Sequence, residues 1–168
     1  MDTAKNLLDT YMIDGIAAGK HHGLSFGQHA DKDTQFWNYG KLGETPISEN
    51  QYFEMASIGK VFTALLILKL EAKGKLLIDD FVEVYIPEFP IKEKITIRHL
   101  LTHTSGLPVS PSNWEFIGPL NSYKNYTISN LLEDFENLEL SKKDFNAFNY
   151  SNYGYLLLGL VAKHASKA

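Results

Sequence analysis

The sequence contains no cysteine, which excludes disulfide bonds and thiolate metal sites and says little about the redox compartment. It also has no cluster of lysine and arginine, and its formal net charge is −4. Because phosphate backbones are bound by concentrated positive charge, nucleic acid is not an expected partner. The longest strongly apolar run, residues 61–68, is too short to cross a bilayer and is typical of a buried helix.

The N-terminal residues 1–6 lack the basic start and the apolar core of a secretory signal peptide. Two localisations stay open: an intracellular protein as written, or an extracytoplasmic protein whose leader has been removed. The chain has 168 residues, of which 44% are hydrophobic and 21% are charged. This length and composition are typical of a globular domain with a real core.

The spacing of apolar residues predicts helices over about residues 3–19, 57–72, 97–102, 128–138 and 152–163. Two extended stretches, residues 22–28 and 35–39, flank a polar turn and predict a hairpin, followed by a loop over residues 40–51. An isolated hairpin is marginally stable in water, so strands that would complete the sheet are expected to lie outside this chain. The predicted fold class is therefore α+β, mostly helical, with an N-terminal hairpin and an incomplete sheet.

Ser57 and Lys60 are the first candidates for chemistry. They stand at the start of a long apolar helix with the spacing Ser-x-x-Lys, which places both side chains on one face, one turn apart. A serine hydroxyl is a weak nucleophile at neutral pH, and an adjacent neutral amine can take its proton. The free N–H groups and the positive dipole of a helix start would also favour an oxyanion.

This pattern by itself has a simpler interpretation. Ser-x-x-Lys is expected by chance in roughly every second chain of this length. Serine is also a favoured helix N-cap, so Ser57 could cap the helix while Lys60 is an ordinary exposed lysine. A second set of residues has to decide between the two interpretations.

Tyr150 and Asn152 form that second set, because they directly precede an apolar helix. A nearby ammonium group would favour the phenolate of Tyr150, which could then act as a general acid or base. The amide of Asn152 offers a donor and an acceptor to a substrate amide. Tyr123 and Asn125 repeat the Tyr-x-Asn spacing in a polar stretch with no apolar helix behind it. We favour Tyr150 and Asn152, since a well-defined site needs rigid support.

Three segments in this order carry a resemblance to a known family. They are residues 53–60, FEMASIGK; residues 98–108, RHLLTHTSGLP; and residues 148–159, FNYSNYGYLLLG. The set is similar to the serine β-lactamase and penicillin-binding protein family, in particular to the branch of class C β-lactamases, D-Ala-D-Ala carboxypeptidases and related esterases. The resemblance extends from about His22 onward and implies the β-lactamase/transpeptidase-like fold.

The resemblance implies a role for each candidate residue. Ser57 would be the acylated nucleophile, Lys60 its proton-relay partner, and Tyr150 a second acid or base. Asn152 would orient the amide of the substrate. The backbone N–H of Ser57 would form half of the oxyanion hole.

Residues 103–108 are a landmark of the family, and we expect them to be structural. Gly106 can adopt a positive φ and Pro108 blocks helix continuation, so this segment is predicted to be a turn that ends a helix. Thr96 is the predicted N-cap of that helix, and Thr127 is the predicted N-cap of the helix that follows it.

The sequence also departs from the family pattern. The family carries a third motif, Lys-Thr-Gly or His-x-Gly, on a later strand that supplies the other oxyanion N–H, and no such triplet follows Tyr150 here. Lys143 and Asp144 replace a proline-glycine pair that is often found upstream of Tyr-Ser-Asn. The chain thus resembles the N-terminal half of a larger enzyme or a truncated gene. Because losing one oxyanion donor costs roughly a hundredfold or more in rate, we expect these residues alone to be nearly inactive.

Our main hypothesis is a serine hydrolase or acyl-transferase that forms an acyl-enzyme with β-lactam, D-alanyl-peptide or ester substrates. One alternative is a non-catalytic module on the same scaffold that binds or senses β-lactams or cell-wall peptides. Another is a truncated product without a function of its own. The expected organisation is a partial domain over residues 1–168, with the helix and hairpin of an α/β lobe in 1–56 and the nucleophile helix and helical lobe in 57–168. A missing C-terminal half would be a further partner.

His21, His22 and His29 are the residues that could suggest a metal site. None of them has a histidine or carboxylate partner at ligand spacing on a predicted rigid element. We therefore expect neither a metal nor a cofactor.

Overall fold

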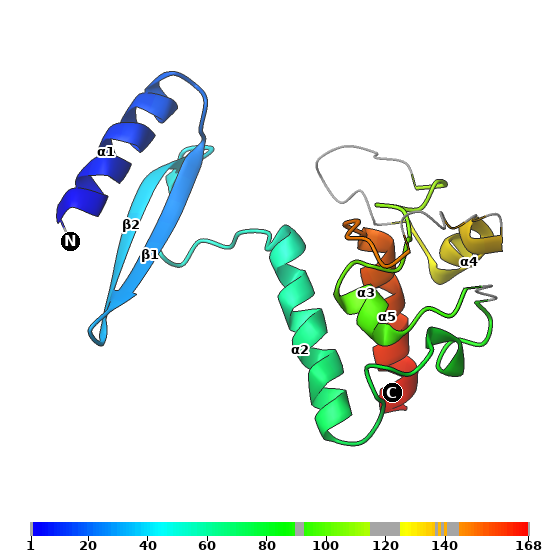
Figure 1. Ribbon diagram of the computed structural model, residues 1–168. Helices are drawn as coiled ribbons and strands as arrows, with labels where there is room; N and C mark the ends of the chain where they lie inside the picture. Colours follow the sequence, from blue (N-terminus) through cyan, green and yellow to red (C-terminus); the bar gives the residue numbers. More distant parts are fainter. Residues whose placement is uncertain are drawn as a thin grey trace. The chain divides into compact units, whose positions relative to one another are not determined.

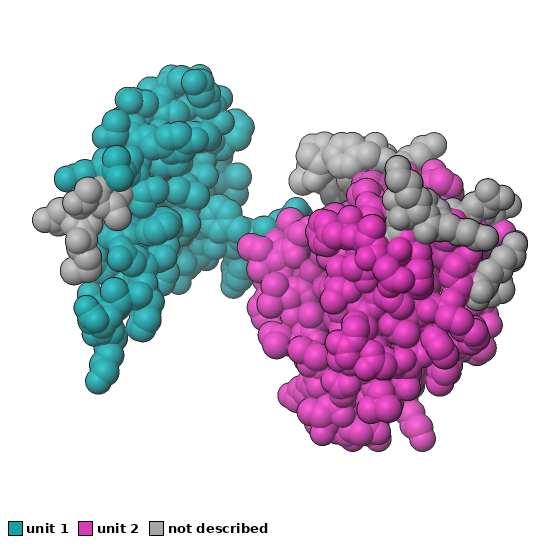
Figure 2. Space-filling view, viewed as in Figure 1, with its two compact units in different colours: residues 1–54 teal, residues 55–168 magenta. Residues whose placement is uncertain are grey.

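The computed structural model describes residues 2–89, 93–114, 125–136, 138, 140 and 145–167. Tyr123 of the second Tyr-x-Asn pair, together with Lys143 and Asp144, lies outside these described residues. The chain divides into two compact units, residues 1–54 and 55–168 (Figure 2). All four candidate site residues belong to the second unit.

The first unit contains helix α1 (Asp2–Ala17) and strands β1 (Gly23–Ala30), β2 (Asp33–Leu42) and β3 (Thr45–Pro46), as Figure 1 shows. The strands form one antiparallel sheet in the order β1-β2-β3. Between β1 and β2, Asp31 and Lys32 have φ angles of 50° and 73°. Such left-handed residues form the two-residue turns whose twist matches that of a hairpin. The predicted hairpin is confirmed, whereas the predicted loop over residues 40–51 contains the short strand β3.

The second unit contains a 3₁₀ turn η1 (Ala56–Ile58), helix α2 (Gly59–Ala72), a 3₁₀ turn η2 (Val82–Val84) and helices α3 (Ile97–Leu101), α4 (Ile128–Glu136) and α5 (Asn152–Ser166). Helix α5 packs against both α2 and α3. Its buried residues recur every three to four positions, the spacing of one helix face: Tyr153, Gly154, Leu157, Leu158, Val161, Ala162 and Ala165. This face of α5 is the centre of the hydrophobic core.

Helix α2 is buried on one side only. Ile67 and Leu70 join the core, while Val61, Phe62 and Leu65 are each more than half exposed. The prediction of a buried helix is therefore wrong for the remaining apolar side, because apolar composition does not specify what packs against a helix. In the described part of the chain, no helix has both the length and the apolar character needed to cross a membrane.

Local side-chain hydrogen bonds define the helix starts that the sequence predicted. Thr96 caps α3 in a reciprocal arrangement with His99, and Thr127 accepts a hydrogen bond from the backbone N–H of Asn130 at the start of α4. Both predicted N-caps are confirmed. Gly106 adopts φ 72°, as expected, but the residue with positive φ directly after the C-cap of α3 is His103, with φ 58°. Histidine is among the non-glycine residues enriched in this conformation.

The N-cap of α5 provides a stability test. Ser151 is 1% exposed; its Oγ accepts the N–H of Gly154 and donates to the carbonyl of Pro108 at 2.7 Å. Ser151→Ala removes both bonds and leaves a carbonyl unpaired, so the free energy of unfolding should fall by about 1–2 kcal/mol, measured in urea.

The matched control is Ser166→Ala at the exposed C-terminal end of the same helix, where Oγ bonds only the carbonyl of Lys163. This change should shift the unfolding free energy by less than about 0.5 kcal/mol. Equal stability of the Ser151→Ala variant and the unmodified chain would contradict the assigned capping role.

Candidate active site

Ser57 lies in the 3₁₀ turn η1 immediately before helix α2, and its side chain is exposed. The N-caps of η1 and α2 are Met55 and Ile58, and neither makes a side-chain capping bond. Ser57 therefore does not act as a helix cap, and this simpler interpretation of the serine is wrong. The preceding residue, Ala56, has φ 44°, a conformation that costs a non-glycine residue energy and that is often found next to functional groups.

The four candidate side chains are connected by hydrogen bonds around the Ser57 hydroxyl. The phenol of Tyr150 donates a hydrogen bond to Ser57 Oγ at 2.8 Å, and Lys60 Nζ lies 3.3 Å from the same oxygen. Lys60 Nζ also donates to Asn152 Oδ1 at 2.7 Å. The nucleophile candidate thus has a phenol and an amine within hydrogen-bond reach, and a base at such a distance can take the proton of a serine.

The lysine also sets the electrostatics of the group. Lys60 Nζ lies 5.1 Å from the centroid of the Tyr150 ring and 5.6 Å from that of Tyr155. The nearby Lys60 ammonium, followed by the hydroxyl of Ser57, lowers the pKa of the Tyr150 phenol below its usual value, against a smaller opposing effect of burial. For Tyr155 the order is different, since burial and then the neighbouring Tyr150 raise its pKa. Of the two tyrosines, Tyr150 is therefore the better candidate for a general base.

The segment 103–109 holds the Tyr150 segment in place through four hydrogen bonds from backbone N–H groups. The bonds are Asn146 N–H to the Thr104 carbonyl (2.9 Å), Asn149 N–H to the His103 carbonyl (2.8 Å), Ser151 N–H to His103 Nδ1 (3.0 Å) and Asn152 N–H to the Val109 carbonyl (2.8 Å). The sequence predicts only a helix-ending turn for residues 103–108. The signal for their pairing with the Tyr150 segment is that they are a landmark of the family, because no local pattern reveals a long-range pairing.

The backbone N–H of Ser57 is available for an incoming oxygen. Among the described residues it donates to no backbone carbonyl, and it lies in η1, two residues before the first residue of α2. Free N–H groups and the helix dipole at such a position favour negative charge. This N–H could therefore supply one oxyanion donor.

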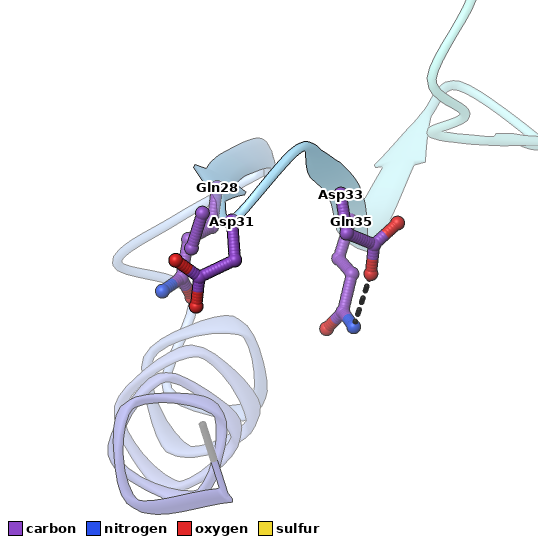
Figure 3. A pocket seen from close by; sticks show the side chains of 5 residues that line it. Gln28, Asp31, Asp33 and Gln35 are labelled. Carbon is purple, nitrogen blue, oxygen red and sulfur yellow. Dashed lines mark hydrogen bonds between the residues drawn. The ribbon is translucent and has the colours of Figure 1, made fainter.

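The described residues contain no group of three or more histidine, aspartate or glutamate side chains that could hold a metal ion. A pocket lies at the turn end of the β1–β2 hairpin and is lined by Gln28, Ala30, Asp31, Asp33 and Gln35 (Figure 3). There, Gln35 Nε2 donates to Asp33 Oδ2 at 3.1 Å. None of the predicted site residues lines this pocket, and all of its lining residues belong to the first unit.

Comparisons with known proteins agree with the resemblance. A sequence model of the β-lactamase family matches residues 8–168. Penicillin-binding protein 4* of Bacillus subtilis is 39% identical over 133 residues, which are 77% of this chain and 29% of that protein. Protein flp of Staphylococcus aureus is 36% identical over 120 residues, which are 68% of this chain and 23% of that protein.

Solved structures show the same fold. A β-lactamase/D-alanine carboxypeptidase from Pseudomonas syringae matches with a TM-score of 0.75 and 26% identity, over 98% of this chain and 45% of the other. A D-amino acid amidase from Ochrobactrum anthropi SV3 matches with a TM-score of 0.77 and 25% identity, over 97% of this chain and 45% of the other. The predicted α+β, β-lactamase/transpeptidase-like fold is confirmed. The chain spans less than half the length of these relatives.

The lysine effect on Tyr150 can be measured by NMR titration of chains with ¹³Cζ-labelled tyrosine, in which Tyr150→Phe identifies the signal. Tyr150 should titrate below the ordinary tyrosine pKa of about 10. Lys60→Met should raise this pKa, because the largest cause of its depression is removed. Since the folded-state pKa is depressed, the phenolate stabilises the fold above the unfolded pKa, and this contribution is lost as the pH falls through the folded-state pKa.

Lys69→Met is the matched control, since Lys69 is an exposed lysine of the same helix. It should leave the Tyr150 titration unchanged. If Lys60→Met and Lys69→Met have the same effect, Lys60 does not tune the phenol.

Proposed function

Because the chain belongs to the β-lactamase family, we propose that it is the nucleophile-bearing part of a serine hydrolase or acyl-transferase. The proposed substrates are β-lactams, D-alanyl peptides or esters, whose carbonyl carbon would be attacked by Ser57 Oγ. The observation that carries the proposal is the pair of hydrogen bonds that Tyr150 and Lys60 make with this oxygen, at 2.8 Å and 3.3 Å.

In the proposed acylation step, the Tyr150 phenolate takes the proton of Ser57 while Oγ bonds to the carbonyl carbon. The carbonyl oxygen becomes an oxyanion, which the Ser57 N–H would stabilise. As the carbon–nitrogen or carbon–oxygen bond breaks, Tyr150 returns the proton to the leaving group, and Ser57 is left as an ester. Water then hydrolyses that ester in a hydrolase, or another acceptor takes the acyl group in a transferase.

Lys60 and Asn152 have supporting roles in this proposal. The ammonium of Lys60 favours the phenolate of Tyr150. Asn152 Oδ1 accepts from Lys60, so its Nδ2 is left to donate to a substrate carbonyl. The same contact restrains Lys60 beside the nucleophile.

The names of the relatives support the substrate classes. One solved relative is called a β-lactamase/D-alanine carboxypeptidase and another a D-amino acid amidase, and a sequence relative is called a penicillin-binding protein. Hydrolysis of a lactam, a peptide or an amide shares one requirement, which is an activated nucleophile at a carbonyl carbon. The Ser57 group meets the requirement, whereas the choice among the substrates depends on residues outside this group.

Covalent labelling with a fluorescent penicillin tests the proposal, measured on the product of the complete reading frame that encodes this chain. The unmodified protein should acquire a label that survives denaturation, and Ser57→Ala should not. Tyr150→Phe should slow labelling by about 10²- to 10⁴-fold, the usual contribution of a general acid–base.

Tyr85→Phe is the matched control, because it removes a phenol hydroxyl that bonds Asp80, outside the site. Its labelling rate should equal that of the unmodified protein. Equal labelling of Ser57→Ala would refute the assigned nucleophile. Penicillin that binds reversibly and leaves no adduct would instead favour the non-catalytic binding or sensor module.

A further inference from the structure

His103 accepts hydrogen bonds from the backbone on both sides of Tyr150. The carbonyl of His103 accepts the N–H of Asn149 at 2.8 Å, and its Nδ1 accepts the N–H of Ser151 at 3.0 Å. Asn149 and Ser151 are the two chain neighbours of Tyr150. A single residue therefore fixes the backbone on either side of the phenol.

The ring of His103 also packs against the aromatic side chains of the site. Its centroid lies 4.6 Å from that of Tyr150 and 5.0 Å from that of Tyr155, with the latter pair stacked. Phe148 lies edge-on at 5.9 Å. The imidazole thus contacts the body of the phenol whose hydroxyl reaches Ser57.

Backbone conformation places the ring in this position. His103 has φ 58°, directly after the C-cap of α3, so the chain reverses there and the imidazole faces the 148–155 segment. Histidine tolerates the left-handed region better than most residues. The residue that ends the helix is therefore also the one that can reach Ser151.

We propose that His103 is a positioning residue for Tyr150, and that its unprotonated Nδ1, by accepting the Ser151 N–H, holds the phenol oxygen within hydrogen-bond distance of Ser57. The neutral ring then carries its proton on Nε2. This role depends on the proposed function for its catalytic meaning, whereas the position of Tyr150 can be measured without turnover.

The charges around the ring favour the neutral form. Burial, and then the positive charge of Lys60, lower the pKa of His103 below its usual value. Three titratable groups lie around the ring: Lys60 of α2, Tyr150 of the segment directly before α5, and Tyr155 of α5. Protonation would place a hydrogen on Nδ1 against the Ser151 N–H and would abolish the contact.

Two variants separate the hydrogen bond from the packing. His103→Phe keeps an aromatic ring and removes the acceptor. His103→Asn removes the ring, keeps an oxygen at the place of Nδ1 and tolerates the left-handed backbone. In the ¹³Cζ-tyrosine titration of the 168-residue chain, His103→Phe should raise the pKa of Tyr150, because the phenol moves away from Lys60 and Ser57. His103→Asn should leave most of the depression in place.

His164→Phe is the matched control, since His164 is an exposed histidine in the last turn of α5, where its Nδ1 donates to the carbonyl of Tyr85. It should not change the Tyr150 titration. An unchanged titration in His103→Phe would overturn the proposal. Equal increases in His103→Phe and His103→Asn would also overturn it, because packing alone would then position the phenol.

A measurement on the unmodified chain keeps the proposal testable if His103→Phe does not fold. The ¹⁵N shifts of the His103 ring should identify the Nε2–H tautomer, with Nδ1 as acceptor, and a proton on Nδ1 near pH 7 would refute the role. In the complete protein, His103→Phe should slow penicillin labelling by about 10²-fold, the cost of a misplacement near 1 Å. Loss of labelling in Ser57→Ala with an unchanged rate in His103→Phe would preserve the proposed function and reject the positioning role.

Discussion

The hydrogen bond between Tyr150 Oη and Ser57 Oγ joins residues that are 93 positions apart, and the rest of the site depends on it. Lys60 reaches Ser57 through local helix geometry, one turn further along the chain. Tyr150 has no such local route and must be brought there by tertiary structure. Packing of α5 on α2 and α3, together with the hydrogen bonds that the Tyr150 segment donates to segment 103–109, provides this placement.

One cation connects the parts of the site. Lys60 hydrogen-bonds Asn152, approaches Ser57, lowers the pKa of Tyr150 and helps to keep His103 neutral. Both pKa effects follow from its positive charge, which favours the phenolate of Tyr150 and disfavours the imidazolium of His103.

Features set by local sequence were predictable. Thr96 and Thr127 cap helices as expected, and Ser57 and Lys60 share a face because their spacing is that of one turn. The approach of Tyr150 could be anticipated only through the resemblance to a family, since no local spacing encodes a contact over 93 positions. The exposed side of α2, the strand β3 and the double role of His103 were not predicted, because each depends on what packs or pairs nearby.

The most direct test of the account is to locate the acyl group by mass spectrometry of proteolytic peptides after the complete protein has reacted with a penicillin. One added penicilloyl mass is expected on the peptide that contains Ser57, and fragmentation should assign it to that hydroxyl. An adduct on another residue, or no adduct on a folded protein, would contradict the claim that Lys60 and Tyr150 activate this serine.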